Sequence, residues 1–201
     1  MSLLLELLNE NLNLPPSTLS NLHRLNKPSG DQVRFIRAPP LPLEESDVVL
    51  GEHTDYGSIT VLFNRVGGLQ ILPPGEDAVW CYVRPLPGHA IINLGDSMVK
   101  FTNGLLRSNI HRVVSPPGLQ AGTTRYSLVY FSRPEDDVFL TRLDGSDRIP
   151  PLMPDGVEET INSKDWILRR ALGRRLVKLR GDQIDFEKAA GTEQISRRIK
   201  A

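Results

Sequence analysis

Three side chains of types that bind metal ions stand out, although one is far from the other two in the sequence. His53 and Asp55 are two residues apart in the stretch Gly-Glu-His-Thr-Asp-Tyr-Gly. In an extended strand, residues i and i+2 point to the same face, so an imidazole and a carboxylate are aimed at one point. His111 lies far downstream, and only the fold can bring this second imidazole to the pair. Two His and one carboxylate leave several metal positions open, which suits non-haem Fe(II) and O₂ chemistry.

A pair of residues suited to binding a carboxylate follows the second histidine. Arg125 and Ser127 are again two residues apart and share a face if this run is a strand. A guanidinium fork beside a hydroxyl is well equipped to bind a carboxylate. The interval between His111 and Arg125 is long enough for a turn and a return strand. We therefore expect the pair to lie near the metal site.

The order His-x-Asp, His, Arg-x-Ser resembles that of the Fe(II)/2-oxoglutarate-dependent dioxygenases. The closest resemblance is to the isopenicillin N synthase-like branch, in its fungal-type variants, and it covers residues 33–135 in register. Besides the ligand motifs, the matching segments are Gly67-Gly68-Leu69-Gln70, Asn93-Leu94-Gly95-Asp96, Asn103-Gly104 and Ser108-Asn109-Ile110-His111-Arg112-Val113.

The resemblance implies a set of roles for these residues. His53, Asp55 and His111 would bind Fe(II), and Arg125 with Ser127 would bind the distal carboxylate of 2-oxoglutarate. The cosubstrate and O₂ would fill the free metal positions. The expected reaction is oxidation of a small organic molecule by hydroxylation, desaturation or ring chemistry, with release of succinate and CO₂, as in secondary metabolism.

One position departs from the family pattern. Family members often carry a Tyr that contacts the cosubstrate just before a pair of prolines, and here that position is Ala38. Arg37 either compensates for the missing Tyr or is a solvated charge. The departure affects one cosubstrate contact and leaves the iron ligands unchanged.

Two other functions are compatible with these residues. The chain could be an iron/O₂ oxidase of the same branch that does not use 2-oxoglutarate, as isopenicillin N synthase and the amino-cyclopropane oxidases are. Arg-x-Ser does not separate this alternative from the first, since both kinds carry it, but succinate formation does. The second alternative is a non-catalytic barrel, because family members usually have a further N-terminal region. We expect a truncated form whose uncovered sheet edge invites self-association. A zinc protease is not indicated, since His-Glu-x-x-His is absent.

Short runs of alternating apolar residues between Gly, Pro and Asn turns predict a mainly β protein with flanking helices. The family resemblance implies a double-stranded β-helix, a cupin-like jelly roll. We divide the chain into a helical segment (1–31), the jelly-roll core (32–135) and a C-terminal linker with a helical extension (136–201). Strands are expected at 32–38, 48–51, 58–63, 69–72, 79–83, 90–94, 108–114 and 124–131.

A basic helix is predicted over residues 163–180. We interpret its Arg and Lys side chains as a solvated face opposite an apolar face that packs on the barrel, and not as a nucleic-acid site. The tail from residue 183 is expected to be partly helical. His23 and His89 are expected not to bind the metal, since the ligand set is complete without them.

Composition bears on partners and compartment. The 201 residues include 24 basic and 24 acidic side chains, so no overall charge recruits nucleic acid or an anionic membrane. Cys81 is the single cysteine, which fits a reducing, cytoplasmic location. The first residues have no basic n-region of a signal peptide. No run approaches the ~18 apolar residues of a membrane span. We expect a small-molecule substrate as the partner, with no nucleic acid and no membrane.

Overall fold

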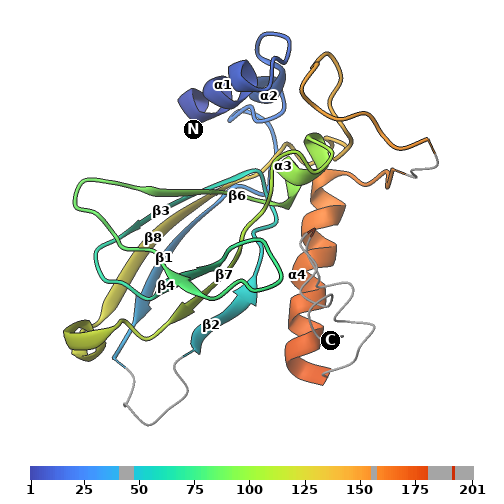
Figure 1. Cartoon of the computed structure of the whole chain (residues 1–201). Coiled ribbons are helices and arrows are strands. Elements are labelled where there is room, and N and C mark those ends of the chain that lie inside the picture. Colours follow the sequence, from blue (N-terminus) through green and yellow to red (C-terminus); the bar gives the residue numbers. More distant parts are fainter. Residues whose placement is uncertain (41–47, 155–157, 181–191, 193–201) are drawn as a thin grey trace.

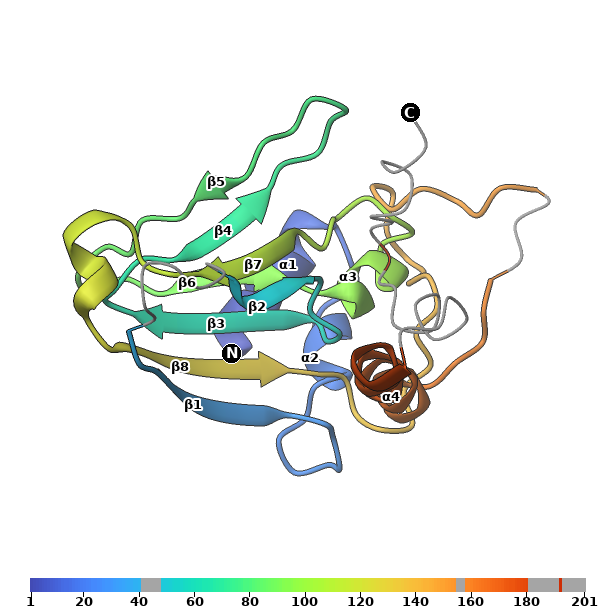
Figure 2. The ribbon, with the colours of Figure 1, turned by 90° about the horizontal axis from the view of Figure 1, so that it is seen from below.

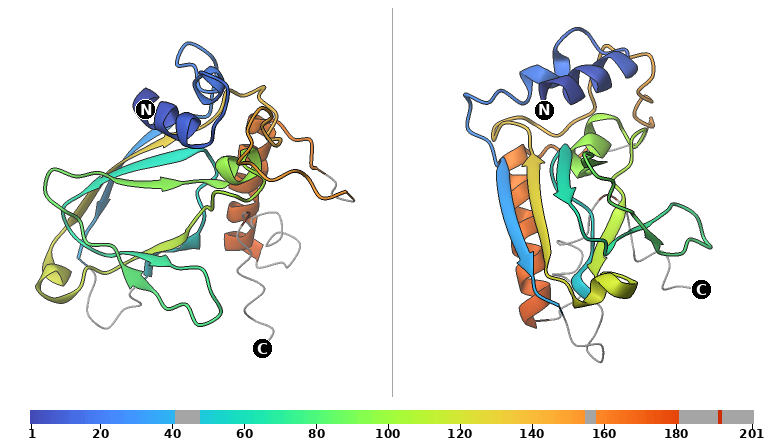
Figure 3. Two further views of the ribbon diagram at one scale, coloured as in Figure 1. Left: turned by 45° about the horizontal axis from the view of Figure 1, so that its top comes forward. Right: turned by 90° about the vertical axis from the view of Figure 1, so that its left-hand side faces the viewer.

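The computed structural model describes residues 1–40, 48–154, 158–180 and Thr192. The strands in these residues are β1 (Gln32–Ala38), β2 (Val48–His53), β3 (Ile59–Asn64), β4 (Leu69–Leu72), β5 (Cys81–Tyr82), β6 (Ile91–Leu94), β7 (Ile110–Val114) and β8 (Arg125–Ser132). They form two sheets, ordered β1-β8-β3-β6 and β2-β7-β4-β5, in which all pairs are antiparallel. The sheets face one another (Figures 1 and 3). Neighbours such as β1 and β8 are far apart in sequence, as in a jelly roll, so the predicted fold is confirmed.

Strand β8 shows why the sheet has an inner and an outer face. Arg125, Ser127 and Val129 are buried, whereas Tyr126 between them is 62% exposed. The alternation follows from the two-residue period of a strand. The prediction was least accurate at residues 79–83, where only Cys81–Tyr82 forms a strand, because β4 pairs with these two residues alone.

Helices cover one end and one side of the sandwich. They are α1 (Ser2–Asn11), α2 (Thr18–Asn21), α3 (Asp96–Phe101) and α4 (Ser163–Arg180), with a 3₁₀ turn at Gly118–Gly122. Helices α1 and α2 lie over one end, and α4 stands beside α3 (Figures 1 and 2). None of these helices is long and apolar enough to cross a membrane, as far as the described residues go.

The main hydrophobic cluster lies under the helices rather than between the sheets. Its buried members are Leu5, Leu12, Leu14, Leu19, Ile59, Met98, Phe101, Leu140, Ile149 and Trp166. Only Ile59 among them belongs to a strand. The main cluster of buried apolar side chains therefore joins the helices to the sandwich from outside, and a separate cavity lies between the sheets.

Helix α4 occupies the predicted residues, but the assignment of its charged face is wrong at one position. Arg170 is 1% exposed, and its Nη2 lies 3.0 Å from Oδ2 of Asp96, which is 0% exposed. Within residues 163–173, the buried side chains are those of Ser163, Trp166 and Arg170, at helical spacing, while Leu168 and Leu172 are about half exposed. The helix therefore packs on α3 through an arginine because a buried carboxylate needs a cationic partner. The predicted tail, Thr192 apart, lies outside the described residues.

We expect Arg170→Met to destabilise the protein by roughly 3–5 kcal/mol, because it leaves the Asp96 carboxylate buried without its cation. Arg169→Met is the matched control: Arg169 pairs with Glu159 at the surface, and such a pair contributes about 0–1 kcal/mol. Denaturant unfolding measures both. Equal losses in the two variants would show that the buried pair has no special role.

Candidate functional site

The fold brings His53, Asp55 and His111 together. His53 ends β2 and is paired in register with His111 of β7. The Nε2 atoms of His53 and His111 lie 3.9 Å and 3.8 Å from Oδ1 of Asp55. One ligand atom from each residue falls within 4.8 Å of the others. The three side chains are thus close enough to share one metal ion.

Both imidazoles present the same nitrogen to the shared point. Nδ1 of His53 lies 2.8 Å from the carbonyl oxygen of Gly51, and Nδ1 of His111 lies 3.0 Å from that of Asn109. A carbonyl only accepts hydrogen bonds, so each Nδ1 carries a proton, and in the neutral form of each ring Nε2 keeps its lone pair. This arrangement fixes ring orientation and tautomer as metal binding requires.

Two polar neighbours orient the carboxylate of Asp55. Thr60 Oγ1 and Asn93 Nδ2 each donate a hydrogen bond of 2.7 Å to Oδ2, which leaves Oδ1 facing the imidazoles. Burial by itself would raise the pKa of Asp55, but His111, His53 and these two hydrogen bonds together hold that pKa below its ordinary value. The carboxylate is therefore ionised and ready to bind a cation. The sequence pattern gave no indication of these roles of Thr60 and Asn93.

Asp55 lies in a loop after β2, whereas the two-residue spacing predicted extended chain from His53 to Asp55. Strand β2 ends at His53, and the chain then turns toward α3. The backbone N–H of Asp96 donates to the Asp55 carbonyl at 2.8 Å, and that of Ser97 donates to the Gly57 carbonyl at 3.0 Å. The start of α3 thus holds the loop in place.

Helix α4 and two close backbone approaches complete the support of this loop. Trp166 Nε1 donates to the Tyr56 carbonyl at 3.0 Å, and Arg170 Nη2 donates to Thr54 Oγ1 at 2.9 Å. A Cβ on Gly57 would lie 2.5 Å from the carbonyl oxygen of Ser132, and one on Gly95 would lie 2.3 Å from that of Gly57. Only glycine fits at these two positions.

Arg125 and Ser127 line the same cavity as the His-Asp-His cluster. Arg125 is 5% exposed; its Nε donates to the Gly67 carbonyl at 2.9 Å and its Nη1 to Ser127 Oγ at 2.5 Å. Its Nη2 is buried and has no hydrogen-bond partner among the described residues. Burial lowers the pKa of Arg125 from its ordinary value. Because Ser127 accepts from Arg125, its own proton remains available for a carboxylate placed there.

The cavity has a volume of about 370 Å³, within the range of small-molecule sites. The polar groups on its wall fit a metal ion together with a carboxylate cosubstrate. Two imidazole nitrogens and one ionised carboxylate at one point suit the metal ion. A buried guanidinium N–H elsewhere on the wall, unpartnered among the described residues, suits the carboxylate.

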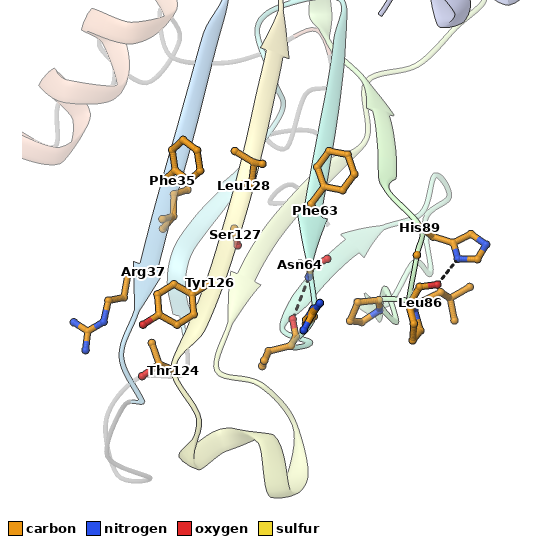
Figure 4. Close-up of a pocket in the computed structure, with 16 residues that line it drawn as sticks. Phe35, Arg37, Phe63, Asn64, Leu86, His89, Thr124, Tyr126, Ser127 and Leu128 are labelled. Atoms are coloured by element: carbon orange, nitrogen blue, oxygen red, sulfur yellow. Dashed lines mark hydrogen bonds between the residues drawn. The ribbon is translucent and has the colours of Figure 1, made fainter.

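The structure corrects the role considered for Arg37. Ala38 lies directly opposite Arg125 in the pairing of β1 with β8, so a Tyr there would be beside the guanidinium. Arg37 is on the opposite face of β1, with Phe35 and Tyr126 along an outer hollow (Figure 4). Neighbouring residues of a strand point to opposite faces. Arg37 therefore does not replace the missing Tyr.

The other two histidines discussed lie outside the cluster. His23 is partly buried, with Nδ1 at 2.7 Å from the Leu19 carbonyl and Nε2 at 2.7 Å from Ser58 Oγ. His89 lines the outer hollow, and its Nδ1 lies 2.9 Å from the Pro87 carbonyl (Figure 4). Both have partners of their own.

A jelly roll that holds two histidines and one carboxylate in its cavity is typical of the non-haem iron oxygenases. Comparison with known families narrows the class: the model of the 2OG-Fe(II) oxygenase superfamily matches residues 21–134. The chain belongs to this superfamily.

Individual relatives and a solved structure agree with this family assignment. A 2-oxoglutarate-dependent dioxygenase of Aspergillus fumigatus is 34% identical over 82% of this chain and 48% of its own length. The dioxygenase iboH of Amanita muscaria is 37% identical over 62% of this chain and 61% of its own length. The crystal structure of a Neurospora crassa protein in complex with alpha-KG superposes with a TM-score of 0.72 at 26% identity, over 84% of this chain and 56% of that one. The chain thus spans about half the length of the relatives it matches.

Proposed function

We propose that this chain is an Fe(II)- and 2-oxoglutarate-dependent oxygenase that oxidises a small organic molecule and releases succinate and CO₂. In this proposal His53, Asp55 and His111 hold the iron, and Arg125 with Ser127 holds the distal carboxylate of 2-oxoglutarate. The observation that carries it is the buried Nη2 of Arg125, unpartnered within the described residues, in the cavity of the metal-ligand cluster. A buried donor without a partner is costly, and a bound carboxylate would satisfy it.

The chain's own residues prepare the site for this chemistry. Iron and 2-oxoglutarate, when bound, supply the O₂-dependent oxidative decarboxylation. The backbone carbonyls behind His53 and His111 keep both Nε2 lone pairs directed at the metal position. Thr60 and Asn93 keep one oxygen of Asp55 directed there as well. Apolar side chains such as Leu62, Ile71 and Val129 line much of the cavity around these groups.

Succinate formation is the experiment that tests the proposal. Protein loaded with Fe(II) and 2-oxoglutarate without O₂ should form succinate once air is admitted, and only when both are present. O₂ consumption without succinate would favour the iron/O₂ oxidase that does not use 2-oxoglutarate. Iron binding with no turnover would favour a non-catalytic barrel.

We further propose that residues 32–135 form the catalytic core, with 1–31 and 136–201 as flanking segments, and that the protein is cytoplasmic. The core assignment rests on the position of all five site residues between β1 and the end of β8. The location rests on the single cysteine, Cys81. We propose no nucleic-acid or membrane partner.

Self-association through an uncovered sheet edge remains part of the proposal. β1 is an edge strand of the β1-β8-β3-β6 sheet, and exposed aromatic side chains on the outer face of this sheet support the proposal. Phe35, Phe63 and Tyr126 are 83%, 49% and 62% exposed on this face (Figure 4). Exposed apolar patches often mark contact surfaces. A sedimentation coefficient independent of protein concentration would exclude self-association.

A further inference from the structure

Two further arginines line the cavity at its other end. Arg34 of β1 and Arg133, just beyond β8, both contribute to its wall. Their guanidinium carbons lie 5.4 Å and 5.9 Å from the centre of the Phe131 ring. Arg125 and Phe131 are six residues apart on β8, or about 20 Å at ~3.4 Å per residue. The cavity therefore has cationic groups at both ends.

Neither of these two arginines forms an ion pair with a carboxylate of the described residues. Arg34 Nε donates to Gln32 Oε1 at 2.9 Å, and Arg133 Nη1 donates to the Gly30 carbonyl. Nε of Arg133 is buried and, within the described part of the chain, has no hydrogen-bond partner.

The neighbouring carboxylate is engaged elsewhere. Oδ1 of Asp31 accepts from the backbone N–H of Arg133 at 2.7 Å, and its Oδ2 accepts from the Tyr130 hydroxyl at 2.5 Å. Burial, followed by the positive charge of Arg34, lowers the pKa of Arg133, and the charges of Asp31 and Asp55 oppose this shift only in part. The two guanidinium groups are thus close enough to repel one another. An anion bound between them would relieve this repulsion and satisfy the buried Nε.

Apolar side chains line much of the cavity between its two ends. They include Ile36, Leu62, Leu69, Ile71, Val129 and Phe131. Val129 and Phe131 lie nearest the arginine pair, opposite Arg34 and Gln32 in the pairing of β1 with β8. A ligand that fits both the wall and the pair has an apolar body and one anionic group. Planar guanidinium groups suit a carboxylate, and aromatic or aliphatic groups suit the wall.

The pair also has a definite position relative to the metal-ligand cluster. Thr60, which donates to Asp55, is the register partner of Phe131 on β8. Asp55 is therefore nearer the Phe131 end of the strand than the Arg125 end. A molecule anchored at Arg34 and Arg133 would lie next to the cluster without using the Arg125 position.

We propose that Arg34 and Arg133 bind the carboxylate of the oxidised substrate, and that this substrate is an organic acid with an apolar body. The proposal rests on the proposed oxygenase function, because it assigns the substrate of that same site. It leaves Arg125 to the cosubstrate, so the two carboxylates occupy opposite ends of one cavity.

The test is calorimetric titration with 4-phenylbutyrate, in protein that contains neither iron nor 2-oxoglutarate. Arg34→Gln and Arg133→Gln should each weaken binding about tenfold, since each removes a charge-assisted hydrogen bond. Arg37→Gln is the matched control, because it removes the same charge from the outer face of the same strand, and it should leave the affinity unchanged. The neutral analogue 4-phenylbutanamide should bind the unmodified protein about tenfold more weakly than the acid.

Several outcomes would overturn this assignment. Equal affinity for acid and amide would do so, as would equal losses in Arg34→Gln and Arg37→Gln. Binding abolished by Arg125→Ala but kept in the other variants would place the probe in the cosubstrate position. Arg34 is exposed, so Arg34→Gln decides the question if Arg133→Gln fails to fold in a thermal melt. Succinate formation without binding at this pair would refute the anchor alone, and binding without succinate would refute the oxygenase function alone.

Discussion

Replacing Asp55 with alanine is expected to abolish iron binding by this chain. Asp55 is the single carboxylate of the cluster, and its Oδ1 lies within 3.9 Å of both imidazole Nε2 atoms. Loss of a residue that merely orients a metal ligand typically costs about 10–100-fold in affinity. Loss of the ligand itself should therefore cost more than ~100-fold. Iron retained after anaerobic loading and desalting measures the effect, and O₂ consumption should disappear with the iron.

Glu52→Ala provides the matched control for this experiment. Glu52 is a nearby carboxylate on β2, but its side chain is exposed and lies outside the cluster. The control should retain one iron per chain. Because Asp55→Ala leaves the donors of Thr60 and Asn93 without their acceptor, circular dichroism must show that the variant is folded. Stoichiometric iron in folded Asp55→Ala would refute the assignment of this ligand.

The strands and the ligand cluster could be predicted because their signals are local. The alternation in β8 separates Arg125 and Ser127 from Tyr126, and the Gly, Pro and Asn turns mark where strands end. The spacing of His53 and Asp55 already indicated a shared target, although the chain achieves this by a turn after β2 and not by a continuous strand. The register that pairs His53 with His111 depends on contacts far apart in sequence and was not predicted. The family resemblance supplied only the expectation that the two histidines meet.

The supporting groups could not be predicted because their roles depend on distant partners. Arg170 has the same local surroundings as Arg169, and its burial follows from Asp96 on another helix. Arg34 and Arg37 differ by three positions, so a strand must place them on opposite faces. The pairing of β1 with β8 decides which face of β1 is the inner one, because Arg34 lies opposite the buried Val129. The role of Thr60 also depends on distant contacts, because its hydrogen bond to Asp55 requires the loop that α3 holds in place.

Arg125→Ala should raise the dissociation constant of 2-oxoglutarate about ten- to a hundredfold. The expected loss corresponds to roughly 1.5–3 kcal/mol for a charge-assisted bidentate pair. Iron affinity should stay nearly intact, because Arg125 bonds to Gly67 and Ser127 and not to His53, Asp55 or His111. The measurement is anaerobic titration of the iron-loaded protein with 2-oxoglutarate.

Tyr126→Phe is the control for this last variant, since Tyr126 is the next residue of β8 and its side chain is exposed on the outer face. It should bind 2-oxoglutarate as the unmodified chain does. Unchanged cosubstrate affinity in Arg125→Ala would favour an iron/O₂ oxidase, because the buried Nη2 would then serve another ligand. A loss confined to Arg125→Ala, with iron still bound, would show that the cation acts on the cosubstrate and not through the metal.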